Sequence, residues 1–226
     1  MCSRIERFRF KDIQYVVKYP DKFDDCEKYP VILFLHGAGT RGNDIEVLLN
    51  NPYFRITDAM DDYPFITFAP LCSANTWFDI FGELKEFVCM LIEKDCVDNK
   101  RVYLMGASMG GYATWQLGMS MPEYFAAMVP ICGGGMYWNA GRLVEIPIWA
   151  FHGKKDTTVL MEESLKMVDA VNQYGGNAKI TVYPDNGHDA WSDTYANQDV
   201  FNWMLEHKKD LVCEWADDYK DCDIYG

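Results

Sequence analysis

The chain has 226 residues, a length that fits one sizeable domain with its own hydrophobic core and leaves little room for a second. Hydrophobic residues make up 49% of the sequence and charged residues 24%, a balance typical of a folded globular protein and not of a disordered chain. With 34 acidic and 21 basic residues, the formal net charge of -13 disfavours nucleic acid and anionic membranes as partners.

The N-terminal half begins with RFRF and IQYVVKYP, which form one bent strand or two short ones. Continuous apolar runs, bounded by Gly or Pro, then predict strands that are buried on both faces of a sheet. Six runs of this kind follow one another along the chain: residues 31–37, 65–70, 101–108, 125–134, 146–153 and 179–185.

Helical patterns lie between these strands. Apolar residues recur on one helical face over residues 79–96, and residues 110–119 are rich in small side chains that allow close packing on a sheet. A helix over 160–174 ends at Gly175-Gly176, and the last helix spans 198–208. Alternating strands and helices predict an α/β fold, a mostly parallel sheet with helices on both faces. Ligands of such sheets bind beyond the carboxyl ends of the strands.

The pentapeptide Gly106-Ala107-Ser108-Met109-Gly110 matches G-x-S-x-G. It follows a predicted strand and precedes a predicted helix, which is the setting of a nucleophile elbow. The sharp turn exposes the serine, and the two glycines avoid clashes around it. Ser108 is therefore the predicted nucleophile, rather than part of a chance pentapeptide.

A second motif, His36-Gly37-Ala38-Gly39, ends the strand at 31–37. In a fold with this elbow, one oxyanion-hole N–H comes from the residue after the nucleophile and one from this loop. We therefore predict the backbone N–H groups of Met109 and Ala38 as the oxyanion hole. His36 precedes the nucleophile in the chain, so we expect it to brace the loop and not to act as the base.

The acid and base are expected after the nucleophile in the order acid, then histidine. Asp156 follows the strand at 146–153, and His188 follows the strand at 179–185. Such a carboxylate orients the imidazole, which then accepts the serine proton. Asp185 is the alternative acid, and a solvated or helix-capping role is the alternative for Asp156. We expect His152 to support the acid loop.

Taken together, the motifs VILFLHGAGTRGND, NKRVYLMGASMGGYATW, IPIWAFHGKKDTTV and TVYPDNGHDAWSDTY resemble those of small carboxylesterases of the α/β-hydrolase fold. These esterases are related to feruloyl esterases, polyhydroxybutyrate depolymerases and dienelactone hydrolases, a group that includes predicted peptidases of the prolyl oligopeptidase type. The resemblance covers about residues 29 to 208. It implies the triad Ser108, Asp156 and His188, and an ester of an acylated sugar or an aromatic acid as substrate.

Only a short loop separates VPICGG from IPIWAF, where many relatives insert a lid. We therefore expect no large lid and a shallow, open site, which disfavours long-chain lipids. We predict that three tryptophans, Trp77, Trp138 and Trp191, line that site, because aromatic rings at its edge can stack on a sugar or an aromatic acyl group. Thr40, which follows the oxyanion loop, is also predicted to line it. A packing role is the alternative for each. For the neighbouring Arg41, a bracing role is favoured over binding a carboxylate.

The sequence thus predicts a single α/β-hydrolase domain over residues 1–226 that acts as a serine carboxylesterase on short-chain or aromatic esters. The expected partner is a small-molecule ester, possibly an acylated oligosaccharide, and no metal or organic cofactor is needed. A small-peptide serine peptidase or amidase is the alternative, followed by a non-catalytic binding protein of the same fold. None of the eight cysteines forms a C-x-x-C pair, so zinc or thioredoxin-like chemistry has no support. The N-terminus has no apolar signal core, so we expect a cytoplasmic protein.

Overall fold

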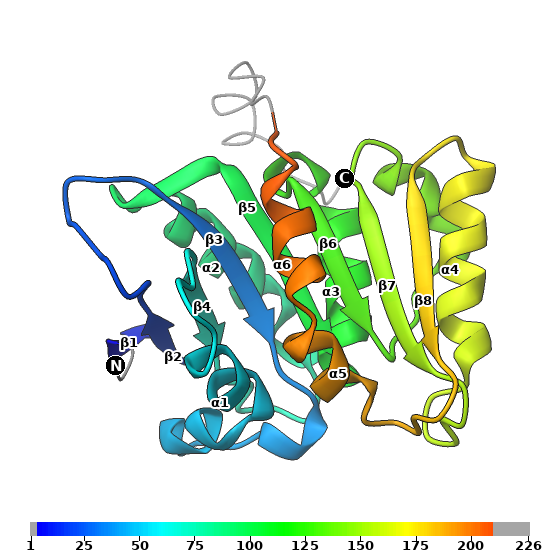
Figure 1. Cartoon of the computed structure of the whole chain (residues 1–226), viewed down its shortest axis with the longest axis horizontal. Coiled ribbons are helices and arrows are strands. Elements are labelled where there is room, and N and C mark those ends of the chain that lie inside the picture. Colours follow the sequence, from blue (N-terminus) through cyan, green and yellow to red (C-terminus); the bar gives the residue numbers. More distant parts are fainter. Residues whose placement is uncertain (1–3, 210–226) are drawn as a thin grey trace, which may run out of the picture.

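The computed structural model describes residues 4–209, and its centre is one eight-stranded sheet (Figure 1). The strand order is β1-β2-β4-β3-β5-β6-β7-β8. The strands are β1 (Ile5–Phe10), β2 (Ile13–Lys18), β3 (Tyr29–Leu35), β4 (Ile66–Pro70), β5 (Val97–Ala107), β6 (Ala127–Ile131), β7 (Ile148–Gly153) and β8 (Ala178–Tyr183). Pairs β1–β2 and β2–β4 are antiparallel, and all the other pairs are parallel. The predicted, mostly parallel sheet is confirmed.

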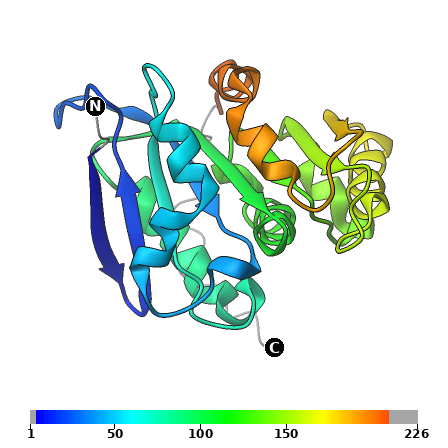
Figure 2. The same cartoon turned by 60° about the horizontal axis from the view of Figure 1, so that its bottom comes forward.

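Helices cover both faces of this sheet, as predicted (Figures 1 and 2). The α-helices are α1 (Pro52–Asp58), α2 (Phe81–Ile92), α3 (Met109–Ser120), α4 (Met161–Gln173), α5 (Ala190–Ala196) and α6 (Gln198–Leu205). The short 3-10 segments are η1 (Ala38–Thr40), η2 (Ile45–Asn50), η3 (Trp77–Ile80), η4 (Pro122–Tyr124) and η5 (Tyr137–Leu143). Buried side chains of α2, α3 and α4 form one apolar core with the sheet, and those of α1, α5 and α6 form the other.

Strand β3 illustrates why the apolar runs are continuous. Leu33 and Leu35 pack in the core under α2 and α3, whereas Ile32 and Phe34 pack in the core on the opposite face. All four side chains have no exposed surface. Because successive side chains of a strand point to opposite faces, a strand with helices on both sides needs apolar residues at every position.

Some predicted elements differ in their boundaries. The N-terminal segment is two strands joined by a tight turn in which Lys11 has a φ of 49°. The helix predicted over 79–96 begins as η3, capped by Thr76 and Asp79, before α2 starts. The predicted last helix ends at Leu205, and α5 precedes it without having been predicted. The acidic stretch 213–226 lies outside the described residues.

Between β6 and β7 the chain contains only η5, in agreement with the prediction that no large lid is inserted there. Within residues 4–209, no helix combines the length and the apolar character that crossing a bilayer requires.

Candidate active site

Ser108 lies in the sharp turn between β5 and α3. Its backbone has a φ of 56° and a ψ of -118°, outside the conformations that a non-glycine residue usually adopts. The turn is also tight: a Cβ added at Gly106 would lie 2.4 Å from the carbonyl oxygen of Gly110, and one at Gly110 would lie 1.9 Å from that of Leu35. Neither glycine tolerates a side chain, so the packing of β3, β5 and α3 depends on both.

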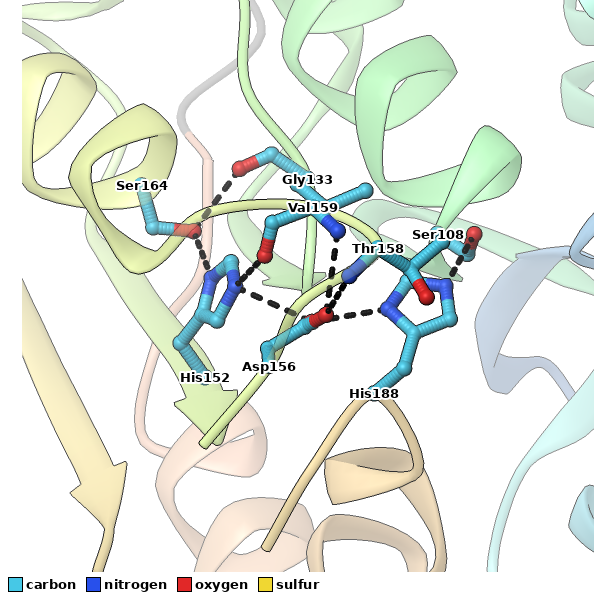
Figure 3. A network of polar contacts seen from close by, with 8 residues as sticks. All are labelled: Ser108, Gly133, His152, Asp156, Thr158, Val159, Ser164 and His188. Carbon is cyan, nitrogen blue, oxygen red and sulfur yellow. Dashed lines mark hydrogen bonds and ion pairs between the residues drawn. The ribbon is translucent and has the colours of Figure 1, made fainter. Parts of the chain in front are cut away.

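Three of the residues predicted as catalytic are brought together at the carboxyl edge of the sheet (Figure 3). His188, in the loop after β8, has its Nε2 2.8 Å from Ser108 Oγ. Its Nδ1 lies 2.7 Å from Oδ2 of Asp156, in the loop after β7. Because a carboxylate only accepts hydrogen bonds, Nδ1 carries the proton, and Nε2 of the neutral ring is left as an acceptor for the serine proton.

Asp156 is held as a carboxylate. Its side chain has no exposed surface, and its Oδ1 accepts hydrogen bonds from the backbone N–H groups of Thr158 (2.9 Å) and Val159 (3.0 Å). Burial alone would raise the pKa of Asp156, but the hydrogen bond from His188 and those from the two backbone groups outweigh it and lower the pKa below 3.8. The alternative acid, Asp185, is exposed and pairs with Lys155 at 2.9 Å.

The predicted oxyanion-hole residues flank Ser108. Ala38 begins η1 and Met109 begins α3. Within the described part of the chain, neither backbone N–H donates a hydrogen bond to a protein acceptor. The loop runs close to the nucleophile, since a Cβ added at Gly37 would lie 3.5 Å from Ser108 Cβ. Both N–H groups are therefore available to a substrate oxygen.

His36 braces this loop, as predicted. It is fully buried, and its Nε2 accepts a hydrogen bond from the Cys72 N–H at 3.0 Å, so its Nδ1 carries the proton and donates to the Gly37 carbonyl at 2.7 Å. Burial lowers the pKa of His36 to about 4, against the opposing effect of the Gly37 hydrogen bond. At neutral pH this ring is therefore uncharged and cannot be protonated at low cost.

The prediction that Trp77 lines the substrate site is wrong. Trp77 has no exposed surface, and its indole N–H donates to the His36 carbonyl at 3.0 Å. Its ring also packs against the His36 ring, with 4.9 Å between centroids. Trp77 therefore packs against His36 inside the protein, where it supports the oxyanion loop, and does not face a substrate. The prediction missed this because a tryptophan at the end of a strand looks the same in sequence whether it points inward or outward.

Two polar residues after the oxyanion loop hold that loop in place. Arg41 donates from Nε to the Ala38 carbonyl (2.9 Å) and from Nη1 to the Asn75 carbonyl (2.5 Å), which confirms its predicted bracing role. Thr40 accepts a hydrogen bond from the Asn51 side chain at 3.2 Å. A contact of Thr40 with substrate stays a prediction.

The other two predicted wall residues differ in their surroundings. Trp138 in η5 is 65% exposed. Trp191 is half-buried, and its ring stands perpendicular to that of His188 with centroids 5.2 Å apart. Their contact with substrate also stays a prediction.

The sequence reasoning missed an apolar groove along α3, between that helix, Phe78 and Phe81, and the loop after β6. It has a volume of about 420 Å³ and is lined mainly by Phe78, Phe81, Tyr112, Gln116 and Met136. Tyr112 is one helical turn after Ser108, and its N–H donates to the Ser108 carbonyl at 3.0 Å. The available signal was the spacing of four residues between Tyr112 and Gln116, which places both side chains on one face of α3.

Within residues 4–209, one group of potential metal ligands lies at the site: Cys132, His152 and Asp156, with their ligand atoms within 4.8 Å of one another. The imidazole and the carboxylate are already hydrogen-bonded to protein partners. Burial raises the pKa of the Cys132 thiol to about 12, so the thiolate that a metal requires is costly here. This donor set is better explained as part of a hydrogen-bond network.

Comparison with other proteins places this geometry in a family. The "Dienelactone hydrolase family" model matches residues 53–208. The chain is 24% identical to "Dipeptidyl-peptidase 5" of Aspergillus fumigatus, over 79% of this chain and 31% of that protein. It is also 24% identical to "Probable feruloyl esterase C" of Aspergillus niger, over 80% of this chain and 69% of that protein. The chain thus spans less than a third of the length of the dipeptidyl-peptidase it matches.

Among solved structures, the crystal structure of a thermostable esterase matches with a TM-score of 0.75 and 30% identity, over 92% of this chain and 63% of that one. A dienelactone hydrolase structure from Klebsiella pneumoniae shares the fold at 15% identity, with a TM-score of 0.70 over 91% of this chain and 98% of that one. The sheet, the helical layers and the family match over more than half of the sequence agree: the chain has the α/β-hydrolase fold and belongs to the dienelactone hydrolase family.

Proposed function

We propose that this protein is a serine hydrolase that cleaves short-chain or aromatic carboxylic esters through an acyl-enzyme. The observation that carries the proposal is the unbroken chain of hydrogen bonds from Ser108 Oγ through His188 to Asp156. It starts at a residue held in a strained turn at the N-terminus of α3, where developing negative charge is stabilised.

In the first half of the reaction, His188 Nε2 takes the Ser108 proton as the oxygen attacks the ester carbonyl. Asp156 stabilises the imidazolium that forms. The N–H groups of Ala38 and Met109 donate to the oxyanion, and by precedent each such donor lowers the barrier by about 3 kcal/mol. The tetrahedral intermediate then collapses, and the alcohol leaves with the proton from His188.

In the second half, water takes the place of the alcohol. His188 removes a proton from this water, which attacks the acyl carbonyl, and the same two N–H groups hold the oxyanion. Collapse releases the acid and returns the proton to Ser108. Every proton passes through His188 Nε2, and the mechanism calls for no metal or organic cofactor.

The apolar groove along α3 supports an ester with an apolar or aromatic part. Its lining is dominated by Phe78, Phe81, Tyr112 and Met136, and Phe78 is itself 49% exposed at the rim. Aromatic rings bind planar apolar groups through their faces and edges. An open groove of about 420 Å³ suits a short acyl chain or a single aromatic ring. The similarity to a feruloyl esterase points to the same substrate class.

A peptidase acting on small peptides is the second candidate, and the similarity to a dipeptidyl-peptidase favours it. The triad chemistry is the same for an amide, but the amine is a poorer leaving group than an alkoxide. Esters and amides with the same acyl group therefore separate the two candidates, because an esterase hydrolyses only the first at an appreciable rate.

The deciding experiment is hydrolysis of p-nitrophenyl acetate, butyrate and decanoate, methyl ferulate, acetylated xylo-oligosaccharide and matched anilides. Ser108→Ala is the test variant. Ser120→Ala, at the far end of the same helix, is the matched control. We expect turnover of short or aromatic esters that Ser108→Ala abolishes and Ser120→Ala retains. Turnover of anilides alone would identify a peptidase. No turnover, together with no labelling of Ser108 by a fluorophosphonate, would indicate a non-catalytic protein.

A further inference from the structure

A second histidine contacts the carboxylate of the acid. His152, near the end of β7, has no exposed surface, and its Nε2 lies 3.2 Å from Asp156 Oδ2, the same oxygen that faces His188 (Figure 3). The same Nε2 lies 2.9 Å from the Val159 carbonyl. On the other side of the ring, Nδ1 lies 2.8 Å from Ser164 Oγ, which donates to the Gly133 carbonyl at 2.7 Å.

The acceptors around this ring determine where its protons lie. Both groups that face Nε2, the Asp156 carboxylate and the Val159 carbonyl, only accept hydrogen bonds. The Ser164 hydroxyl has a single proton, which donates to the Gly133 carbonyl, so its oxygen is left as the acceptor for Nδ1. Nε2 carries a proton that donates to the Val159 carbonyl, and Asp156 Oδ2 lies 3.2 Å from the same nitrogen.

We propose that His152 is a positioning residue for the triad, holding the Asp156 carboxylate in the rotamer that faces His188. This inference rests on the proposed function. His152 Nε2 lies 3.2 Å from the Asp156 oxygen that orients His188 and is hydrogen-bonded to Val159, which in turn binds Asp156, and Ser164 anchors the far side of the ring to the loop after β6. Neither residue lies within hydrogen-bonding reach of Ser108 in the contacts of the described chain.

The hydrogen bonds of Val159 link His152 to the loop that carries Asp156. Val159 is bound twice: its N–H donates to Asp156 Oδ1, and its carbonyl accepts from His152 Nε2. The segment from 156 to 159 is therefore closed around the imidazole. Without His152, the Val159 carbonyl loses its partner, and the Val159 N–H that donates to Oδ1 is held less firmly. The carboxylate then keeps its bonds to Thr158 and His188 but has a wider range of orientations, and His188 is aligned with Ser108 for less of the time.

Three substitutions separate positioning from simple packing. His152→Gln keeps an N–H near the place of Nε2, His152→Asn reaches only toward Ser164, and His152→Leu fills space without donating. We expect kcat for p-nitrophenyl acetate to fall by roughly 10- to 100-fold in the Leu and Asn variants, the range found for partners that orient a functional ligand. KM should stay within about threefold, and Gln should restore most of kcat. His207→Gln, a histidine outside this network, is the matched control.

The low-field proton NMR signal of His188 Nδ1–H gives a readout independent of turnover. It should persist in wild type, His152→Gln and Ser108→Ala, and shift or broaden in the Leu and Asn variants. If His152→Leu does not fold, the comparison of Gln with Asn decides. Equal kcat and an unchanged low-field signal in both would overturn the inference.

Failure of the inference and failure of the proposed function are distinguishable. If Ser108→Ala abolishes ester hydrolysis while all folded His152 variants keep the wild-type kcat, only the positioning role is wrong. If wild type hydrolyses no ester, the proposed function fails, and the NMR signal alone still tests whether His152 orders the Asp156–His188 pair.

Discussion

The two sides of the site are built in different ways. On the catalytic side, His36 and the Asp156 side chain have no exposed surface, and each is held by hydrogen bonds to backbone groups. On the substrate side, Phe78 and Trp138 are 49% and 65% exposed. The comparison teaches that the sheet and its buried polar contacts hold the proposed catalytic residues rigidly, whereas the exposed rings lie on short segments that can change without disturbing the fold.

The largest loss of activity is expected when the proposed base, His188, is replaced. His188→Ala removes the only imidazole that contacts Ser108 Oγ, so the serine keeps its proton. By precedent, we expect kcat to fall by about 10⁶-fold. Steady-state rates of p-nitrophenyl acetate hydrolysis measure this loss, and circular dichroism checks that the variant is folded. A residual rate within tenfold of wild type would contradict a role of His188 as base.

A somewhat smaller loss is expected at the acid. Asp156→Asn preserves the shape of the side chain, but its amide is neutral and favours the wrong tautomer of His188, so kcat should fall by about 10⁴-fold. Asp185→Asn is the matched control, because Asp185 lies near His188 in sequence but is exposed and paired with Lys155. If both variants lose activity equally, the assignment of the acid is wrong.

His36, which braces the oxyanion loop, should make the stability of the folded protein depend on pH. The pKa of His36 falls from 6.5 to about 4 on folding, so between these pH values the unfolded chain binds more protons than the folded one. Stability is therefore lost as the pH falls from 6.5 to 4, by about 3 kcal/mol for this group.

Urea unfolding at pH 7 and at pH 4.5 measures that loss. In His36→Gln the difference between the two pH values should shrink by about 2 to 3 kcal/mol, because glutamine does not titrate. An undiminished difference would mean that other groups cause the acid sensitivity.

The smallest effects on activity are expected for the exposed aromatic residues, and they would show whether these residues act separately from the catalytic ones. Phe78→Ala removes one wall of the groove, so KM for methyl ferulate should rise by roughly three- to tenfold, in line with about 1 kcal/mol for a partly exposed ring contact. The kcat for p-nitrophenyl acetate should not change. Trp138→Ala tests the predicted substrate contact of Trp138 in the same way. A fall in acetate kcat would show that these rings also support the catalytic residues.

The parts of the molecule that could be predicted are those in which the local sequence and the fold agree. The apolar runs identified the parallel strands because a strand buried on both faces has no polar positions. Ser108, Asp156 and His188 could be ordered along the chain because each follows a strand, and strand ends converge at one edge of a parallel sheet. The structure brings these three together as expected.

The parts that were missed depend on the direction in which a side chain points. Trp77 and Phe78 are neighbours, and the sequence offers no means of telling which is buried, yet the first has no exposed surface and the second is 49% exposed. The support of the acid loop by His152 was predicted, but the contact of His152 with Ser164 was not, because it depends on how α4 packs against β7. Helix α5 was missed because only seven residues, starting just after His188, carry its pattern.

The thiol beside the acid has a consequence for chemical labelling. Burial raises the pKa of Cys132 to about 12 and also raises the pKa values of Cys72, Cys89 and Cys96. Among the cysteines of residues 4–209, only Cys26 is exposed, in the loop that leads into β3, at the opposite edge of the sheet from Ser108. Among these five cysteines, a maleimide should therefore react fastest at Cys26, so that within residues 4–209 the label would sit at the edge of the sheet away from Ser108.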